Sequence, residues 1–185
     1  MQYYKLIFNY ETHKEYPLAE PSHDLRNRYI IYDGNEISDW EPVQFECDVQ
    51  DTSCINENLG NSYRWPILSQ NALKLLGDII NEDVQLLPVQ VISKESGNEI
   101  GKYSVLNILP LIDALDLTNS IYFYHGKNKE HLSVVEYALK KSKVEKNHIF
   151  RLKDSAGTVF VSEKFREIAR KNKMRSFDFI KVKMK

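Results

Sequence analysis

Short segments rich in β-branched and aromatic residues recur along the chain, and most neighbouring segments are joined by only a few residues. Such segments favour β-strands. Turn-forming residues at 96–99 separate two of these segments, and residues 154–157 separate another two. Both connections are too short for a parallel crossover, so the strands that they join should be antiparallel. Because helical patterns do not alternate regularly with strand patterns, the sequence predicts an α+β fold and not a doubly wound one.

The predicted sheet is largely antiparallel, with about eight strands accompanied by about three helices. One expected strand contains Pro88, which has no N–H to donate, so this strand should lie at a sheet edge or be broken at the proline. The expected strands cover residues 3–10, 29–32, 40–47, 84–92, 103–109, 120–125, 148–152, 158–161 and 177–183.

Two of the expected helices follow serines that can cap them. Ser69 precedes an apolar stripe over residues 70–81, and Ser162 precedes a second helical pattern over residues 163–173. A serine at this position accepts a hydrogen bond from a backbone N–H that has no partner inside the helix. Residues 129–141 form the third predicted helix. Its apolar residues recur on one helical face: Leu132, Val135 and Leu139.

The chain has 185 residues, of which 42% are hydrophobic. A chain of this length buries enough surface to fold without a disulfide or a metal, and we expect one domain over residues 1–185 that begins with strands and a loop in residues 1–35. No apolar run approaches the ~20 residues of a membrane helix, and the N-terminus lacks the pattern of a secretory signal peptide. Cys47 and Cys54 should be reduced thiols of a cytoplasmic protein that makes no membrane contact.

The net charge of −1 conceals an uneven distribution of charge along the chain. Residues 1–92 contain 15 acidic and 6 basic residues, whereas residues 93–185 contain 11 acidic and 19 basic ones. Eight acids and no Lys or Arg lie between residues 33 and 58. Two interpretations are open: the two halves attract each other within one fold, or a charged face binds a charged partner.

The acidic stretch is the candidate partner-binding surface. An acidic face accelerates the encounter with a cationic protein, and Trp is a frequent interface anchor. Trp65, which precedes Pro66, is expected in the core, whereas Trp40 is compatible with either the core or an interface. The candidate residues are Asp39, Trp40, Glu41, Glu46, Asp48, Asp51 and Glu57.

Two other classes of function find some support. Asp113 and Asp116 are three positions apart, as the metal ligands or acid/base groups of a metal-dependent hydrolase or nuclease would be on a helical turn. The competing interpretation gives this pair a structural role in the turn after Pro110. Residues 140–185 contain 15 basic and 5 acidic residues with phenylalanines between them, as in single-strand nucleic-acid binders. The spacing of these phenylalanines favours burial, however, and no motif for nucleophilic catalysis, zinc or phosphate binding is present.

Several short motifs in a fixed order carry a resemblance to a known family. They include Tyr103-Ser104-Val105-Leu106-Asn107-Ile108, followed by Asp113-Ala114-Leu115-Asp116 and Ser120. Further matching elements are Pro66-Ile67-Leu68-Ser69, Leu87-Pro88-Val89, Ile149-Phe150-Arg151-Leu152 and Val161-Ser162-Glu163-Lys164-Phe165. Over roughly residues 40–180, the chain resembles the eleventh class of immunity proteins of bacterial polymorphic toxin systems, a family long catalogued as a domain of unknown function.

The resemblance implies a function that the residues alone do not reveal. Proteins of this family are thought to bind and neutralise a cognate toxin, and they are not enzymes. By resemblance we expect a cytoplasmic toxin-binding protein with no cofactor and no nucleic-acid partner. The motifs look like residues that hold the fold, so no binding residue is carried over from the family, and the oligomeric state stays open.

Overall fold

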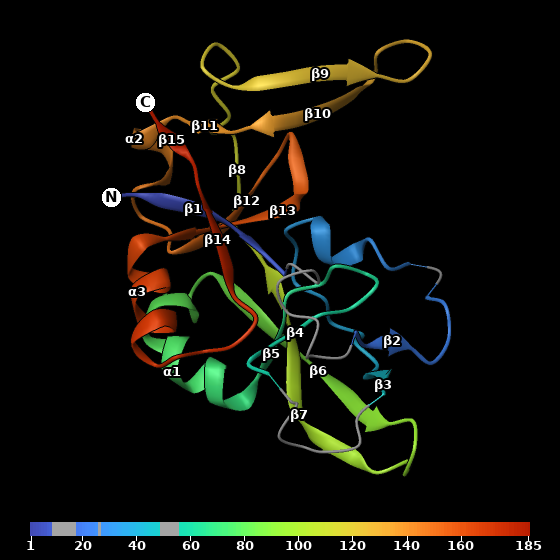
Figure 1. Cartoon of the computed structure of the whole chain (residues 1–185). Coiled ribbons are helices and arrows are strands. Elements are labelled where there is room, and N and C mark those ends of the chain that lie inside the picture. Colours follow the sequence, from blue (N-terminus) through green and yellow to red (C-terminus); the bar gives the residue numbers. More distant parts are fainter. Residues whose placement is uncertain (9–17, 26, 49–55) are drawn as a thin grey trace.

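The computed structural model describes residues 1–8, 18–25, 27–48 and 56–185 (Figure 1). Within these residues the fold is α+β, as predicted. Two larger sheets hold most of the strands, two small sheets of two strands each lie beside them, and the α-helices are three. Most strand pairs are antiparallel, which confirms the predicted sheet type.

The six-stranded sheet, in the lower part of Figure 1, has the order β2-β3-β6-β7-β5-β4. Its centre is the predicted antiparallel hairpin of β6 (Val84–Ser93) and β7 (Glu99–Ile108). Gly97 in the connecting turn has a φ of +69°, a left-handed conformation that glycine adopts without steric cost. The shorter strands are β2 (Glu20–Pro21), β3 (Val43–Cys47), β4 (Asn58–Leu59) and β5 (Ile67–Ser69).

Two sequence predictions in this region were wrong. The strand β6 lies between β3 and β7 and continues through Pro88, so it is neither an edge strand nor broken. Pairing with β3 begins one residue later, at Val89, and the proline therefore stands where β6 has only β7 beside it. Residues 29–32 do not form a strand either. Ile30–Tyr32 is a 3₁₀ helix, η1, which buries Ile31 completely.

The five-stranded sheet joins the two ends of the chain. Its order is β14-β1-β13-β12-β8, and the first strand lies between two strands from the C-terminal part. The predicted hairpin of β12 and β13 is present, and its strands are antiparallel. The strands are β1 (Tyr3–Ile7), β8 (Leu111–Ile112), β12 (Ile149–Leu152), β13 (Ser155–Ser162) and β14 (Asp178–Lys181).

Two helices begin at the predicted caps and pack against each other on one side of the molecule (Figure 1). The Oγ of Ser69 accepts a hydrogen bond from the N–H of Ala72 at 3.2 Å, and α1 (Gln70–Ile80) follows. The Oγ of Ser162 accepts one from the N–H of Phe165, also at 3.2 Å, and α3 (Glu163–Lys171) follows. Both predicted caps are confirmed.

The predicted helix over residues 129–141 is wrong. The chain forms β10 (His131–Glu136), β11 (Ala138–Leu139) and the single turn α2 (Lys141–Val144). Leu132 and Val134, two positions apart, both pack against the core, which is strand periodicity, while Val135 is 62% exposed. The strand β10 pairs with β9 (Ile121–His125) in a ribbon at the top of Figure 1, and β11 pairs with β15 (Lys183–Met184).

Three apolar clusters form the core. One fills the space between α1, α3 and both larger sheets, and it includes Leu68, Leu76, Val161 and Phe165. Because this cluster draws on both sheets, it supports the proposal that residues 1–185 are one domain. A second cluster surrounds Trp65 in the six-stranded sheet, as predicted for that residue. The third lies on the five-stranded sheet below the β9–β10 ribbon and contains Tyr3, Phe150 and Phe160.

Candidate functional site

Acidic side chains follow the β2–β3 edge of the six-stranded sheet. Asp39 and Glu41 are exposed in the segment that leads into β3, and Asp48 is exposed directly after it. Within β3, Val43, Phe45 and Cys47 are buried, so alternation turns Glu46 toward the solvent, where it is half-buried. Together with Glu20 of β2, these residues are called the acidic edge: Glu20, Asp39, Glu41, Glu46 and Asp48.

Two of these carboxylates face each other across neighbouring strands. Glu20 and Glu46 are directly opposite in the antiparallel pairing of β2 with β3. Like charges at such positions repel each other and destabilise the sheet. The pairing of Glu20 with Glu46 therefore opposes folding, so a contribution to stability does not explain why these two acids lie opposite each other.

Trp40 lies beside the acidic edge with its ring partly buried. Its Nε1 donates a hydrogen bond to the carbonyl oxygen of Pro88 at 2.8 Å, and its ring centroid is 6.0 Å from that of Trp65. The ring also packs against the cluster around Trp65. Trp40 thus combines the two roles that the sequence left open: one part of the side chain contacts the core and the remainder faces the solvent.

Two of the predicted site residues do not belong to this edge. Asp51 lies outside the described residues. Glu57 is half-buried, and its Oε2 accepts hydrogen bonds from the backbone N–H of Arg175 at 2.8 Å and from the Nε of Arg175 at 3.3 Å. The carboxylate of Glu57 thus joins the acidic half of the chain to the basic half.

Direct ion pairs account for little of the uneven charge distribution. Among the ion pairs between described residues, Glu57–Arg175 joins the two halves, and the others lie within the C-terminal half. For the acidic edge, the described part of the chain shows no basic side chain within ion-pair distance.

The Asp113–Asp116 segment is not a helical turn. Its two central residues, Ala114 and Leu115, are buried. The Oδ2 of Asp116 accepts a hydrogen bond from Asn119 at 2.6 Å, and the backbone N–H of Asp116 donates one to Ala138 at 2.9 Å. The burial of Ala114 and Leu115 and the hydrogen bonds of Asp116 give this segment a structural role. In the ranges that the structure describes, no three His, Cys, Asp or Glu side chains are close enough to hold a metal ion.

The aromatic residues of the basic C-terminal part are not available for base stacking. Phe150 and Phe160 are completely buried and stack on each other with centroids 5.6 Å apart. Phe177 is 9% exposed, and Phe179 packs beside it against the core. The sequence spacing correctly predicted this burial, and with it the nucleic-acid interpretation loses its stacking residues.

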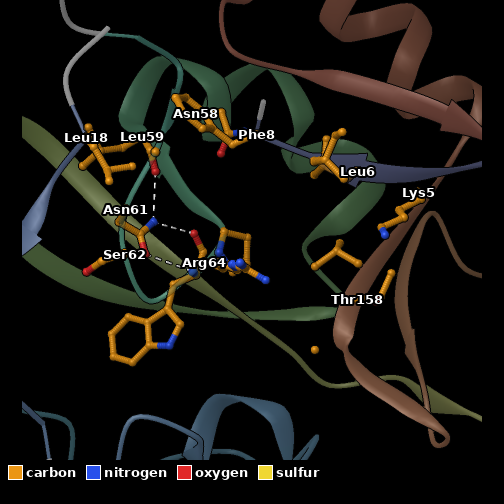
Figure 2. A pocket seen from close by; sticks show the side chains of 16 residues that line it. Lys5, Leu6, Phe8, Leu18, Asn58, Leu59, Asn61, Ser62, Arg64 and Thr158 are labelled. Carbon is orange, nitrogen blue, oxygen red and sulfur yellow. Dashed lines mark hydrogen bonds between the residues drawn. The ribbon is translucent and has the colours of Figure 1, made fainter. Parts of the chain in front are cut away.

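A cavity of about 740 Å³ opens between β1, β13 and the segment around β4 (Figure 2). The side chain of Asn61 shapes its wall: Nδ2 donates to the carbonyls of Leu59 at 3.0 Å and Trp65 at 2.8 Å, and Oδ1 accepts from the N–H of Trp65 at 3.0 Å. Lys5 and Arg64 are the charged side chains among its described lining residues, which include no Asp, Glu, His or Cys. The described lining thus offers hydrogen-bond donors but neither a carboxylate nor an imidazole to act as a general base.

Cys47 is a poor candidate for a nucleophile. It is a free thiol with no exposed surface, and burial raises the pKa of this thiol to about 12. A thiol is nucleophilic only as the thiolate, which this pKa strongly disfavours near neutral pH. Cys54 lies outside the described residues.

Sequence reasoning missed one exposed apolar surface, on the β9–β10 ribbon. All five residues of β9 are exposed, among them Phe123 at 54% and Tyr124 at 47%. The available signal was the uninterrupted apolar run of residues 121–124, which lacks the alternation of a strand with one buried face. The strand itself was predicted, but its exposure was not.

Comparison with known proteins identifies the family. No curated protein matches the chain. Among the described residues, no helix is long and apolar enough to cross a membrane. The sequence model of the immunity protein family (Imm11) matches residues 5–184, nearly the whole chain, and includes both larger sheets and the ribbon. The chain therefore belongs to the Imm11 immunity protein family, as its motifs indicated.

Proposed function

We propose that this chain protects bacterial cells by binding a cognate toxin directly in the cytoplasm, without catalysis and without a cofactor. The observation that carries this proposal is the family match over residues 5–184. A binding inhibitor requires a complementary surface instead of a tuned acid/base pair, and a stable interface of this kind buries about 1,600 Å² in total.

The acidic edge supplies the proposed toxin-binding surface. Asp39, Glu41 and Asp48 are exposed, and the half-buried Glu20 and Glu46 face each other at a cost to folding. Trp40 beside them provides an aromatic anchor that its hydrogen bond to Pro88 already orients. A toxin with a basic face fits this edge, because complementary charge gives specificity and speeds association.

Co-expression tests the proposed function as a whole. Each toxin encoded beside this gene is produced with and without the chain, and growth is measured. We expect one of these toxins to arrest growth alone, to be harmless with the chain, and to co-purify with it as a stoichiometric complex. If no adjacent toxin is bound or neutralised, the proposal is wrong.

Charge reversal tests the proposed surface. The triple variant Glu41→Lys, Glu46→Lys and Asp48→Lys should slow toxin association by about tenfold or more at low salt, measured by surface plasmon resonance. Glu57 is left unchanged because its substitution would also break the contact with Arg175.

A matched control separates position from net charge. The acids at positions 78, 82 and 167 are exposed and lie outside the acidic edge: Asp78, Glu82 and Glu167. Their reversal to lysine changes the net charge equally and should leave toxin association close to that of the natural chain. Equal association rates for the two triple variants would show that the toxin binds elsewhere.

A further inference from the structure

The sheet edges of this fold differ in how they are protected from pairing with another chain. An exposed edge strand presents unpaired N–H and C=O groups, and proteins blunt such edges with short strands, charges, prolines or bulges. Among the described strands, the edges β2, β4, β8, β11 and β15 have two residues each. The longer edge β14 begins with Asp178 and ends with Lys181.

The β9 edge has none of these protections. The strand has five residues, Ile121–His125, with no Lys, Arg, Asp, Glu, Pro or Gly among them. Its ribbon partner β10 is blunted on its own outer side, because its register shifts between Val134 and Glu136 and Glu136 forms an ion pair with Lys183 at 2.8 Å. In Figure 1, β9 lies on the far side of β10 from the rest of the molecule.

The two faces of the ribbon have different surroundings. Tyr122 and Tyr124 lie on the face shared with Leu132 and Val134, which pack against the core below. The opposite face presents Ile121, Phe123 and His125 to the solvent. The core supports the ribbon through Leu132 and Val134, whereas a further strand would add backbone hydrogen bonds along the outer side of β9.

We propose that β9 pairs with β9 of a second copy of this chain, making a four-stranded sheet with the order β10-β9-β9-β10. A two-fold axis at Phe123 pairs all five residues: Phe123 faces its own copy, Tyr122 faces Tyr124, and Ile121 faces His125. No like charges meet in this arrangement, since the strand carries none. Aromatic and β-branched residues form favourable cross-strand pairs.

The pairing surface suits a weak dimer. The exposed fractions on β9 are 51% for Ile121, 37% for Tyr122, 54% for Phe123 and 47% for Tyr124. With about 200 Å² per large side chain, these residues present on the order of 400 Å² per copy. Two copies thus present about 800 Å², which corresponds to a weak, transient interface, and backbone hydrogen bonds between the two edge strands supply much of its affinity. This self-association leaves the acidic edge to the toxin and goes beyond the proposed function.

Analytical ultracentrifugation of the purified full-length chain tests the pairing. We expect a weak monomer–dimer equilibrium, so a concentration series from about 1 to 300 µM should contain monomer and dimer together. Phe123→Lys places like charges on the two-fold axis and should give a monomer. The matched control Ile180→Lys alters a side chain with 51% exposure on the charged edge strand β14, and it should dimerise like the natural chain.

Cross-linking tests the register without relying on a variant that weakens the dimer. In a Cys54→Ser background, Phe123→Cys should form an intermolecular disulfide on oxidation, because directly paired residues lie within disulfide range. Tyr122→Cys should not, because its copy lies diagonally across the axis at about 7–8 Å. Cys47 is fully buried and contributes no background.

A natural chain that stays monomeric throughout the concentration range would overturn the proposal. So would a dimer that Phe123→Lys leaves intact, or a disulfide that forms at position 122 and not at 123. A monomeric natural chain whose Phe123→Lys variant fails to bind the toxin would assign the ribbon to the toxin instead of to a second copy.

Discussion

Arg151 is a charged side chain in an almost water-free environment, with 1% of its surface exposed. Its guanidinium lies over the ring of Tyr32 at 4.8 Å, and Nη1 donates to the carbonyl oxygen of Ala156 at 2.5 Å. Its Nε and Nη2 have no hydrogen-bond partner in the described structure. Burial therefore lowers the pKa of Arg151 to about 10, although Tyr32 opposes this shift. The native fold keeps a cation here with only part of its hydrogen bonding satisfied.

Replacing Arg151 with an apolar residue of similar length should stabilise the protein. A buried charge is often no more favourable than a well-packed apolar side chain, so Arg151→Met should raise the free energy of unfolding by about 1 kcal/mol or more. Arg151→Ala should instead lower it by about 2 kcal/mol or more, because a cavity remains. Urea denaturation of both variants measures the difference. A methionine variant less stable than the alanine variant would contradict this explanation.

His148 makes the cap of α3 sensitive to pH. The Oγ of Ser162 accepts a hydrogen bond from the backbone N–H of Phe165. When Nδ1 of His148 is unprotonated, the Ser162 hydroxyl also donates a hydrogen bond to that nitrogen, at 2.8 Å. Burial lowers the pKa of His148 below its ordinary value of 6.5; Lys164 adds to this shift and Asp83 opposes it. The unfolded chain therefore binds a proton at this residue more readily than the folded chain does.

The free energy of unfolding should consequently fall as the pH drops below about 6.5. The contribution of neutral His148 to the free energy of unfolding is fully present above this pH. It is lost as the pH falls through the lower pKa that His148 has in the folded state. His148→Gln should flatten the profile between about pH 6.5 and 5, before most carboxylates are protonated. Urea denaturation across this interval measures the slope. The exposed His23 serves as control, and an unchanged slope in His148→Gln would rule out this residue as the cause.

At the scale of elements, local signals predicted structure well wherever one side chain decides the outcome. Ser69 and Ser162 cap their helices because each needs only a backbone N–H three residues later. The hairpins β6–β7 and β12–β13 were likewise predictable, since short connections impose antiparallel pairing. Their connections lie at residues 94–98 and 153–154, whereas the turns were predicted at 96–99 and 154–157.

Segments with two compatible periodicities were not predictable. Leu132, Val135 and Leu139 fit a helical face, yet Leu132 and Val134 fit a strand equally well. The segment forms a strand because the neighbouring β9 pairs with β10 and supplies its hydrogen-bonding partners. Residues 29–32 have the composition of a strand, but Ile31 is buried through a single 3₁₀ turn. Tertiary contacts override propensity in both cases.

The candidate site was predictable only in part, for a related reason. The acids of residues 33–58 are visible in the sequence, and alternation in β3 correctly turns Glu46 outward. That Glu20 lies opposite Glu46, or that Glu57 contacts Arg175, depends on pairing between segments distant in the chain. The exposure of β9 likewise depends on whether another element covers it, and no local pattern encodes this.

At the scale of the whole molecule, the uneven charge makes it possible to measure which surface the proposed toxin approaches. The acidic edge and the basic C-terminal part, where residues 140–185 carry 15 basic and 5 acidic residues, attract partners of opposite sign. Salt screens such long-range attraction, with a Debye length of about 30 Å at 0.01 M and about 10 Å at 0.1 M ionic strength. The association rate with the toxin therefore reports which surface the toxin approaches.

If the toxin approaches the acidic edge, its association rate should fall about tenfold as ionic strength rises from about 0.01 to 0.3 M, while the dissociation rate changes little. The variant with Glu41, Glu46 and Asp48 reversed should associate more slowly at low salt and depend less on salt. If the toxin instead approached the basic part, the same variant would associate faster, because its added positive charge would attract an acidic toxin more strongly. Stopped-flow experiments measure the association rates of the natural chain, this variant and the control with Asp78, Glu82 and Glu167 reversed. The two cases differ in whether the variant associates more slowly or faster than the natural chain. This criterion does not depend on the toxin's activity.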